Sequence, residues 1–270
     1  MAITTLDGVI AGMQWPRSFE KSVTATLVAG RPASLWSLGG NPGAGSFNAT
    51  LNGVTLSSTG GNVAGQIPFT DPGSGNAHLA YFQGAATQAG TLQLYDRLWH
   101  NGGYTITSTS AQNSTTPTWP ARDANGSTNG EGVILAVEVS AATGAGTPTI
   151  TIGYTNSAGT AGRTATNIIA TVASSAIGAT YFIALHAGDI GVRSVQSLTL
   201  SATWTSGTIN LVACRLLASL PLPIAGVGNS IDAPSGGLVY MPNGCVPWLV
   251  FRPNTTTATT VSGSMAYTVG

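Results

Sequence analysis

The densest group of residues that could do acid–base chemistry is Asp96, Arg97 and His100, which fall within one short run of the chain. A carboxylate near an imidazole can act as an acid–base pair. The same residue types also form structural ion pairs, with a histidine at the end of a strand. The run around them, Leu92–Asn101, has the apolar residues of a buried strand. We therefore predict that this cluster holds structure.

A second candidate is a pair of carboxylates, Asp123 and Glu131, in a stretch rich in Gly and Asn. Two carboxylates at a suitable separation can hydrolyse a glycosidic bond. A solvated loop is the interpretation that we favour, because Gly and Asn are turn residues. The sequence also lacks the glycine-rich phosphate loop, the dinucleotide-binding motif and the Gly-x-Ser-x-Gly nucleophile motif. We expect a protein that is not an enzyme.

Metal and cofactor sites are not predicted either. His78, His100 and His186 show no metal-ligand spacing, and Cys214 and Cys245 are too few for a structural zinc site. A disulfide between the two cysteines stays open at this point. The expectation is a protein without metal or other cofactor.

Two further motifs have competing interpretations. Trp99, Tyr104 and Trp119 are candidates for a sugar-binding groove, but aromatic residues serve more often as core or interface anchors. The segment Gly188–Gly191 has the look of a calcium loop, yet a single Asp supplies too few oxygen ligands. We interpret it as a turn.

Charge is unusually scarce. Nine Lys and Arg residues balance nine Asp and Glu residues, and together they make up 7% of the 270 residues, against about 25% in an ordinary soluble domain. Without an excess of positive charge, direct binding to nucleic acid is disfavoured. No apolar stretch approaches the roughly 20 residues of a membrane-spanning helix. The first residues lack the basic and apolar regions of a secretory signal.

A short amphipathic helix is predicted over residues 4–13. Leu6, Val9, Ile10 and Met13 recur at helical spacing, and Trp15-Pro16 ends the pattern. A helix of this length is marginal alone and needs a surface on which to dock. We expect residues 1–20 to leave the main fold and dock on a neighbouring subunit, with Leu6, Val9, Ile10, Met13 and Trp15 as the contact residues.

Short strands with turn signals between them dominate residues 91–217, and several of the strands alternate in polarity. Such a pattern predicts an all-β fold, a jelly-roll-like β-sandwich with a short N-terminal helix and extended arms. An immunoglobulin-like sandwich is the rival, but the Cys…Trp…Cys spacing is absent. The expected strands are Thr91–Trp99, Tyr104–Thr107, Gly132–Ser140, Pro148–Thr155, Arg163–Thr171, Thr180–His186, Val195–Trp204 and Thr208–Leu216.

The chain therefore divides into four expected parts. Residues 1–21 form an N-terminal arm with the short helix, and residues 22–90 form a Gly- and Pro-rich irregular segment with short strands. Residues 91–217 form the sandwich core. Residues 218–270 form a C-terminal extension that adds strands to this sandwich or to another copy.

Three runs of sequence carry a family resemblance: Leu94–His100, Tyr154–Thr164 and Ala187–Leu200. Together with the opening residues 2–13, they resemble virion structural proteins of tailed bacteriophages. The resemblance covers about residues 1–40 and 90–217 and leaves 41–85 and the C-terminal extension unmatched.

The resemblance implies a particle component, a capsid decoration or cement protein on the capsid exterior that bridges neighbouring capsid subunits. Its partners would be the major capsid protein and further copies of itself in a trimer, with no direct contact to nucleic acid or membrane. The alternative is a tail- or fibre-associated sandwich that binds a host-surface glycan.

Overall fold

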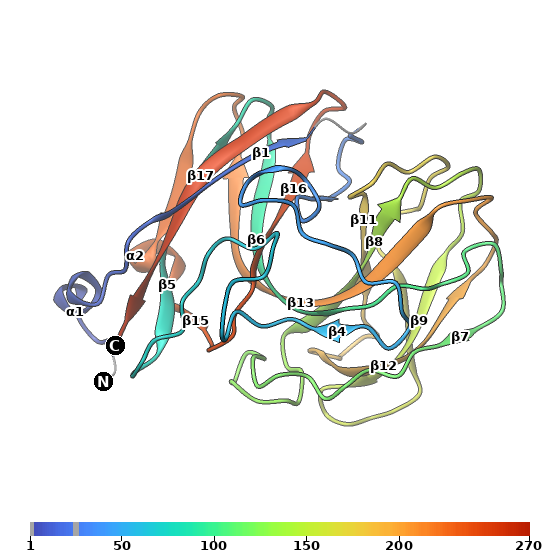
Figure 1. The fold of residues 1–270 in the computed structure, drawn as a ribbon, viewed down its shortest axis with the longest axis horizontal. Coiled ribbons are helices and arrows are strands. Elements are labelled where there is room, and N and C mark those ends of the chain that lie inside the picture. Colours follow the sequence, from blue (N-terminus) through green and yellow to red (C-terminus); the bar gives the residue numbers. More distant parts are fainter. Residues whose placement is uncertain (1–2, 24–26) are drawn as a thin grey trace.

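The computed structural model describes residues 3–23 and 27–270. The fold is all-β and sandwich-like, as predicted, with curled antiparallel sheets (Figure 1). The described residues contain two short helices, α1 (Leu6–Ala11) and α2 (Ala233–Gly236). Every strand pairing within the described residues is antiparallel.

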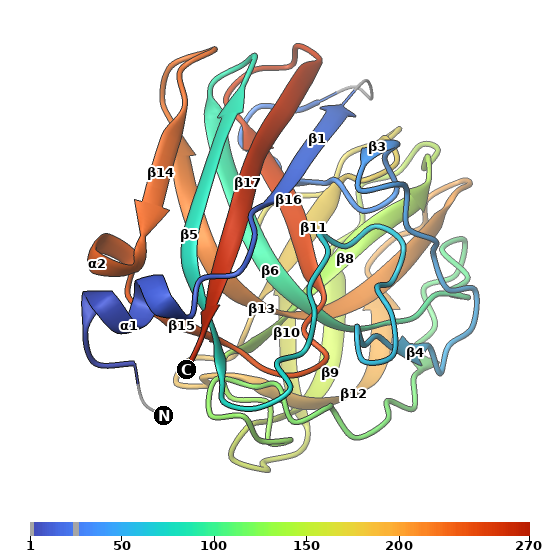
Figure 2. The ribbon, with the colours of Figure 1, turned by 60° about the vertical axis from the view of Figure 1, so that its left-hand side comes forward.

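The first sheet has six strands in the order β14-β5-β17-β1-β3, and β15 also pairs with β5. Figure 2 shows β5, β17 and β1 side by side in front of β6 and β16. The strands of this sheet are β1 (Arg17–Val23), β3 (Gly40–Asn41), β5 (Ala77–Ala86), β14 (Asn229–Asp232), β15 (Val239–Met241) and β17 (Thr259–Val269).

The second sheet has eleven strands in the order β2-β16-β6-β13-β8-β11-β10-β9-β12-β7, and β4 pairs with β6. Its strands are β2 (Ala33–Ser34), β4 (Val54–Thr55), β6 (Gly90–His100), β7 (Gln112–Asn113), β8 (Val133–Ala141), β9 (Ile150–Asn156), β10 (Arg163–Asn167), β11 (Thr180–Ala184), β12 (Val192–Leu200), β13 (Thr208–Leu222) and β16 (Pro247–Pro253).

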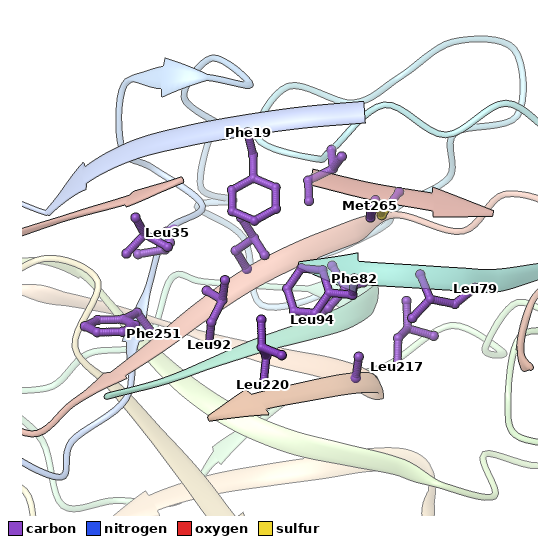
Figure 3. Packing of buried hydrophobic residues seen from close by; sticks show 14 of the residues in the cluster. Phe19, Leu35, Leu79, Phe82, Leu92, Leu94, Leu217, Leu220, Phe251 and Met265 are labelled. Atoms are coloured by element: carbon purple, nitrogen blue, oxygen red, sulfur yellow. The ribbon is translucent and has the colours of Figure 1, made fainter. Parts of the chain in front are cut away.

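One hydrophobic core fills the space between the two sheets. Phe19, Phe82 and Met265 of the first sheet face Leu92 and Phe251 of the second (Figure 3). The ring of Phe19 occupies space that a side chain would need at Gly263, where an added Cβ would lie 2.6 Å from the ring. Glycine is therefore required at this position in β17, and its missing side chain lets the ring pack against the strand.

A second core lies inside the curled half of the long sheet. The alternation predicted for β9 is confirmed, because Ile150, Ile152 and Tyr154 are all buried in this core. Strands β6 and β13 contribute to both cores, with Leu92 in the first and Trp99 in the second. These two strands therefore join the two halves of the molecule.

The two sheets draw their strands from several of the four expected parts of the chain. All six strands of the first sheet come from outside residues 91–217. β13 also continues through the boundary at residue 217. The C-terminal residues supply β16, beside β6, and β17, between β5 and β1. The Gly- and Pro-rich segment supplies β5, so both layers of the sandwich depend on chain outside the expected core.

One predicted strand, Tyr104–Thr107, is wrong. Tyr104 and Ile106 are buried in the second core, as the pattern required, but the backbone between them pairs with a side chain. The amide of Gln112 accepts a hydrogen bond from Thr105 N at 2.6 Å and donates one to Thr105 O at 3.1 Å. A side chain thus takes the place of a neighbouring strand.

Candidate functional site

Helix α1 forms because its first turn is capped. The hydroxyl of Thr5 accepts a hydrogen bond from Gly8 N at 3.1 Å, and Asp7 lies near the positive end of the helix. The helix ends at Gly12, whose N–H bonds to Gly8 O. With only Val9 buried, at 7% exposure, the helix contributes little to the core.

Backbone contacts hold this segment on β17. Gln14 N donates to Tyr267 O at 2.8 Å, and Val269 N donates to Gly12 O at 3.0 Å. The hydroxyl of Thr268 donates to Val9 O at 2.8 Å. At Gly12 an added Cβ would lie 2.1 Å from Val269 O, so the close approach requires glycine. The helix is therefore docked on the chain's own sheet.

Residues 17–20 also differ from the expectation that the first twenty residues leave the sandwich. They form the first half of β1 and pair with Ser262–Met265 of β17. The alternating burial of Phe19 and Lys21 in β1 gives the reason, since one face of this strand closes the first core. Of the described residues before β1, Met13 forms a single bridge to Thr268 of β17, and the others lie outside the strands of the sheet.

Leu6, Ile10, Met13 and Trp15 remain exposed, and we name them the N-terminal apolar surface. Their exposed fractions are 61% for Leu6, 62% for Ile10, 38% for Met13 and 82% for Trp15. Val9, the fifth predicted contact residue, faces the chain's own fold. Four of the five predicted residues are thus exposed within residues 6–15.

A groove beside this surface extends it toward α2. It has a volume of about 240 Å³ and is lined mainly by apolar side chains, among them Ile3, Leu6, Pro234 and Leu238. The groove and the N-terminal apolar surface share Leu6. Large apolar side chains exposed together on one side of a protein often mark a contact with another macromolecule.

The Asp96, Arg97 and His100 cluster is buried and divided between two ion pairs. Arg97 pairs with Glu138 at 2.8 Å, and Asp96 pairs with Arg122 at 3.3 Å. Neighbouring positions in a strand point to opposite faces, which separates Asp96 from Arg97. Asp96 also accepts a hydrogen bond from Val246 N at 2.9 Å.

A β-bulge explains why Arg97 and His100 share a face. The register between β6 and β13 shifts so that Leu98 is an extra residue, and both Leu98 and Trp99 enter the second core. Arg97 Nη2 then lies 2.8 Å from His100 Nδ1. Burial and the nearby Arg97 charge lower the pKa of His100 to about 3, so this imidazole is neutral.

Two tryptophans enclose the Arg97 guanidinium. Its central carbon lies 4.5 Å from the ring centre of Trp36 and 4.7 Å from that of Trp248. The positive charge is thus stabilised by two aromatic faces and by one carboxylate. The arrangement is a buried ion-pair network in which the named side chains contact protein groups.

Asp123 organises its loop. It accepts hydrogen bonds from Ser127, Asn125, Gly130 and Glu131, four of them from backbone N–H groups. Burial alone would raise the pKa of Asp123, but these hydrogen bonds outweigh it and lower the pKa. Glu131 reaches Asp123 through its backbone, while its carboxylate accepts from Asn125 Nδ2 at 2.8 Å.

The aromatic groove interpretation is wrong, because Trp99, Tyr104 and Trp119 are all buried in the second core. Their apolar rings fill the core that β6 shares with the curled sheet, and the rings of Trp99 and Trp119 pack with centroids 5.6 Å apart. Cys214 and Cys245 are both buried and unpaired. No disulfide therefore links β13 to the loop before β16.

The Gly188–Gly191 segment contains a turn, as predicted. Asp189 accepts hydrogen bonds from the Tyr154 hydroxyl and from Asn156 Nδ2, both at 2.6 Å. These hydrogen bonds lower the pKa of Asp189. The carboxylate thus fastens the turn to β9.

Glu138 and Arg122 were not among the predicted functional residues. Glu138 interrupts the apolar run Val133–Val139, and a charge inside such a run is a signal for a buried ion pair. The partner of Glu138 could not be predicted from the sequence, because Arg97 lies on a strand far away along the chain. Arg215 gives a similar signal, and it donates to the carbonyls of Arg122 and Tyr240.

In the described part of the chain, neither helix is long and apolar enough to cross a membrane. Within the same residues, no three His, Cys, Asp or Glu side chains gather in a group suited to hold a metal ion.

Comparison with known proteins adds little. No protein-family model matches the sequence, and no curated protein matches it. The VP2 subviral particle of infectious bursal disease virus aligns over 96% of this chain and 81% of its own, with 9% identity and a TM-score of 0.17. T=1 particles derived from the same virus align over 96% and 79%, with 9% identity and a TM-score of 0.17. These are virus particle proteins, and the similarity is too low to establish a shared fold.

Proposed function

We propose that this protein is a structural component of a tailed-bacteriophage virion. It acts as a decoration protein that binds the major capsid protein on the outside of the head and joins neighbouring capsid subunits. The sequence resemblance to virion structural proteins supports the class of protein. The all-β fold with its buried hydrophobic clusters supports a structural role.

The N-terminal apolar surface is the observation that carries the proposal. Leu6, Ile10 and Trp15 are more than half exposed on a segment that the fold holds in place through β17. A partner that covers these side chains gains about 25 cal/mol for each Å² of apolar surface removed from water. A pre-positioned segment also loses less conformational entropy on binding than a free arm does.

The composition indicates how such a contact would be stabilised. With nine charges of each sign in 270 residues, and several of them buried in ion pairs, few charged groups remain for an interface. Exposed ion pairs contribute only about 0–1 kcal/mol each. Attachment and self-association, with a trimer as the expected state, therefore depend on apolar contacts and shape.

The first experiment locates the protein. Purified virions are labelled with gold-conjugated antibodies against it and imaged by electron microscopy. Label distributed over the head is expected. Label restricted to the tail contradicts the capsid assignment and favours the tail-associated alternative. A glycan-binding site in that alternative would have to use residues other than Trp99 and Trp119, because both are buried.

The second experiment tests the surface. Ile10→Ser and Trp15→Ser variants are incubated with virions stripped of the protein, and the bound amount is measured after sedimentation. We expect binding to fall at least tenfold. Ile168→Ser and Ile190→Ser are matched controls, because both isoleucines are 63% exposed and lie outside the N-terminal segment. Equal losses in all four variants would refute the assignment of the surface.

A salt series tests the nature of the contact. The protein should stay on the virion up to about 1 M NaCl, where the screening length is only about 3 Å. Release by salt alone would show that the contact is electrostatic.

A further inference from the structure

A cavity lies where residues 27–34 meet the loop before β11. Its volume is about 160 Å³, and it is lined by residues 27–28, 31–34 and 172–177 with Val23, Leu38 and Ala179. Most of these side chains are apolar, and Arg31 is the one charged residue among the described residues that line it. The cavity is remote in sequence from the N-terminal apolar surface and shares no residue with it.

Arg31 is buried without a counter-charge. Only 6% of the residue is exposed, and its Nε has no hydrogen-bond partner among the described residues. No carboxylate of residues 3–23 or 27–270 lies within ion-pair distance of it. The sequence reinforces this observation, since residues 21–70 and 139–188 contain no Asp or Glu at all. The two segments that line the cavity therefore contain no carboxylate that could pair with Arg31.

The other buried arginines all have acceptors, which Arg31 lacks among the described residues. Arg215, which is also 6% exposed, donates to the carbonyls of Arg122 and Tyr240, and the other two have carboxylates. Arg97 has Glu138 at 2.8 Å, and Arg122 has Asp96 at 3.3 Å. The Arg31 guanidinium has the face of Tyr181, with 5.3 Å between its central carbon and the ring centre. The Arg31 Nε is buried without an acceptor, which is unfavourable, and an anion that enters the cavity would supply one together with a counter-charge.

The size and the apolar lining of the cavity limit which anions can bind in it. A dry cavity of about 150 Å³ accommodates a molecule the size of benzene. Apolar walls favour a ligand with an apolar body, while the guanidinium favours a planar carboxylate that can accept two parallel hydrogen bonds. Sulfate and phosphate match the charge but leave the apolar walls without a partner.

We propose that this cavity is a binding site for a small organic monocarboxylate, with Arg31 as the residue that binds the carboxylate and the apolar side chains around it as the pocket for the ligand body.

Benzoate is the probe, and isothermal titration calorimetry of the full-length protein is the measurement. We expect saturable binding at a single site. Benzyl alcohol, which has the same ring without the charge, should bind at least tenfold more weakly. Sodium sulfate should also bind at least tenfold more weakly, because it lacks the apolar body.

Variants identify the site. Arg31→Met keeps the length and apolar stem of the side chain, removes the charge and should weaken benzoate binding at least tenfold. Arg17→Met, at the start of β1 and outside the cavity, is the matched control and should bind within twofold of the unmodified protein. Ala176→Phe fills the cavity from its wall, leaves Arg31 in place and should abolish binding.

Near-ultraviolet circular dichroism of each variant shows whether it is folded. If Arg31→Met fails to fold, Ala176→Phe and the comparison of benzoate with benzyl alcohol still decide the question. The proposal is overturned if benzoate shows no saturable binding, if a folded Arg31→Met binds as tightly as the unmodified protein, or if sulfate binds as tightly as benzoate.

Discussion

Arg97 and Glu138 form an ion pair that is entirely withdrawn from solvent, with 2.8 Å between Nη2 and Oε2. The two residues lie on β6 and β8, which flank β13 in the long sheet. The pair therefore spans the strand that both cores share. Its charges lie in a region of low dielectric constant, where a lone charge is far more costly than a paired one.

Replacement of Glu138 by Gln should lower the free energy of unfolding by about 3–5 kcal/mol, because it leaves the Arg97 charge without a counter-charge. Urea denaturation followed by tryptophan fluorescence measures the change. Glu20→Gln, on the exposed face of β1, is the control and should change stability by less than about 0.5 kcal/mol. Similar losses of unfolding free energy from both substitutions would show that the buried ion pair contributes no more to stability than an exposed carboxylate does.

His100 makes stability depend on pH in a defined window. Its pKa is lowered to about 3, whereas an unfolded histidine has a pKa of about 6.5. Between these values the unfolded state binds a proton that the folded state does not, so stability falls as the pH falls from about 6.5 toward 3. The slope from this one group is at most about 1.4 kcal/mol per pH unit.

Chemical denaturation at several pH values measures this slope. His100→Gln should flatten it, and His186→Gln, which alters an exposed histidine, should leave it as it is. The same slope in His100→Gln and in the unmodified protein would contradict the assignment.

Lys21, the single lysine of the sequence, is buried in β1 and donates to the carbonyl oxygens of Leu38, Pro42 and Gly43. Lys21→Met should destabilise the protein by at least about 2 kcal/mol, because three carbonyls lose their donor. Thermal unfolding at constant pH measures the effect. Arg17→Met on the same strand should lower stability much less. An equal loss of stability would show that the effect comes from any substitution in β1 and not from the hydrogen bonds of Lys21.

Asp123→Ala should loosen the loop 123–131 more than it destabilises the whole molecule, because the carboxylate accepts hydrogen bonds only from that loop. Hydrogen exchange measured by mass spectrometry should become at least tenfold faster in this segment. Glu131→Gln, which alters a carboxylate with a single acceptor role, should have little effect. Unchanged exchange in Asp123→Ala would contradict the role.

The stability that Asp123 contributes should be present at neutral pH. Its folded pKa is lowered, so the contribution is complete above the unfolded pKa of about 3.9. It is lost as the pH falls through the lowered folded value. Acid titration of the exchange rate in the same loop checks this.

Local periodicity was enough to predict the all-β class and most of the strands. The alternation of Ile150, Ile152 and Tyr154 follows directly from the two faces of β9. The same logic was wrong for Tyr104–Thr107, because burial of alternate side chains does not require a neighbouring strand when the Gln112 amide satisfies the backbone.

Long-range pairing could not be predicted in the same way. The position of Glu138 in an apolar strand predicts a buried, oppositely charged partner. That this partner is Arg97 depends on the order of the strands in the sheet and on the bulge at Leu98. The first sheet shows the same difficulty. Its central strand, β17, comes from the last residues described, and no local signal ties Thr259–Val269 to Arg17–Val23.

That pairing has a consequence for how the chain folds during synthesis. β1 is made early, but β17 lies between β1 and β5, so the first sheet stays split until residue 269 leaves the ribosome. At 5–20 residues per second, the wait is on the order of tens of seconds. For that time β1, with Phe19 on its apolar face, lacks the β17 strand with which it pairs along its full length, so the core between the two sheets cannot close.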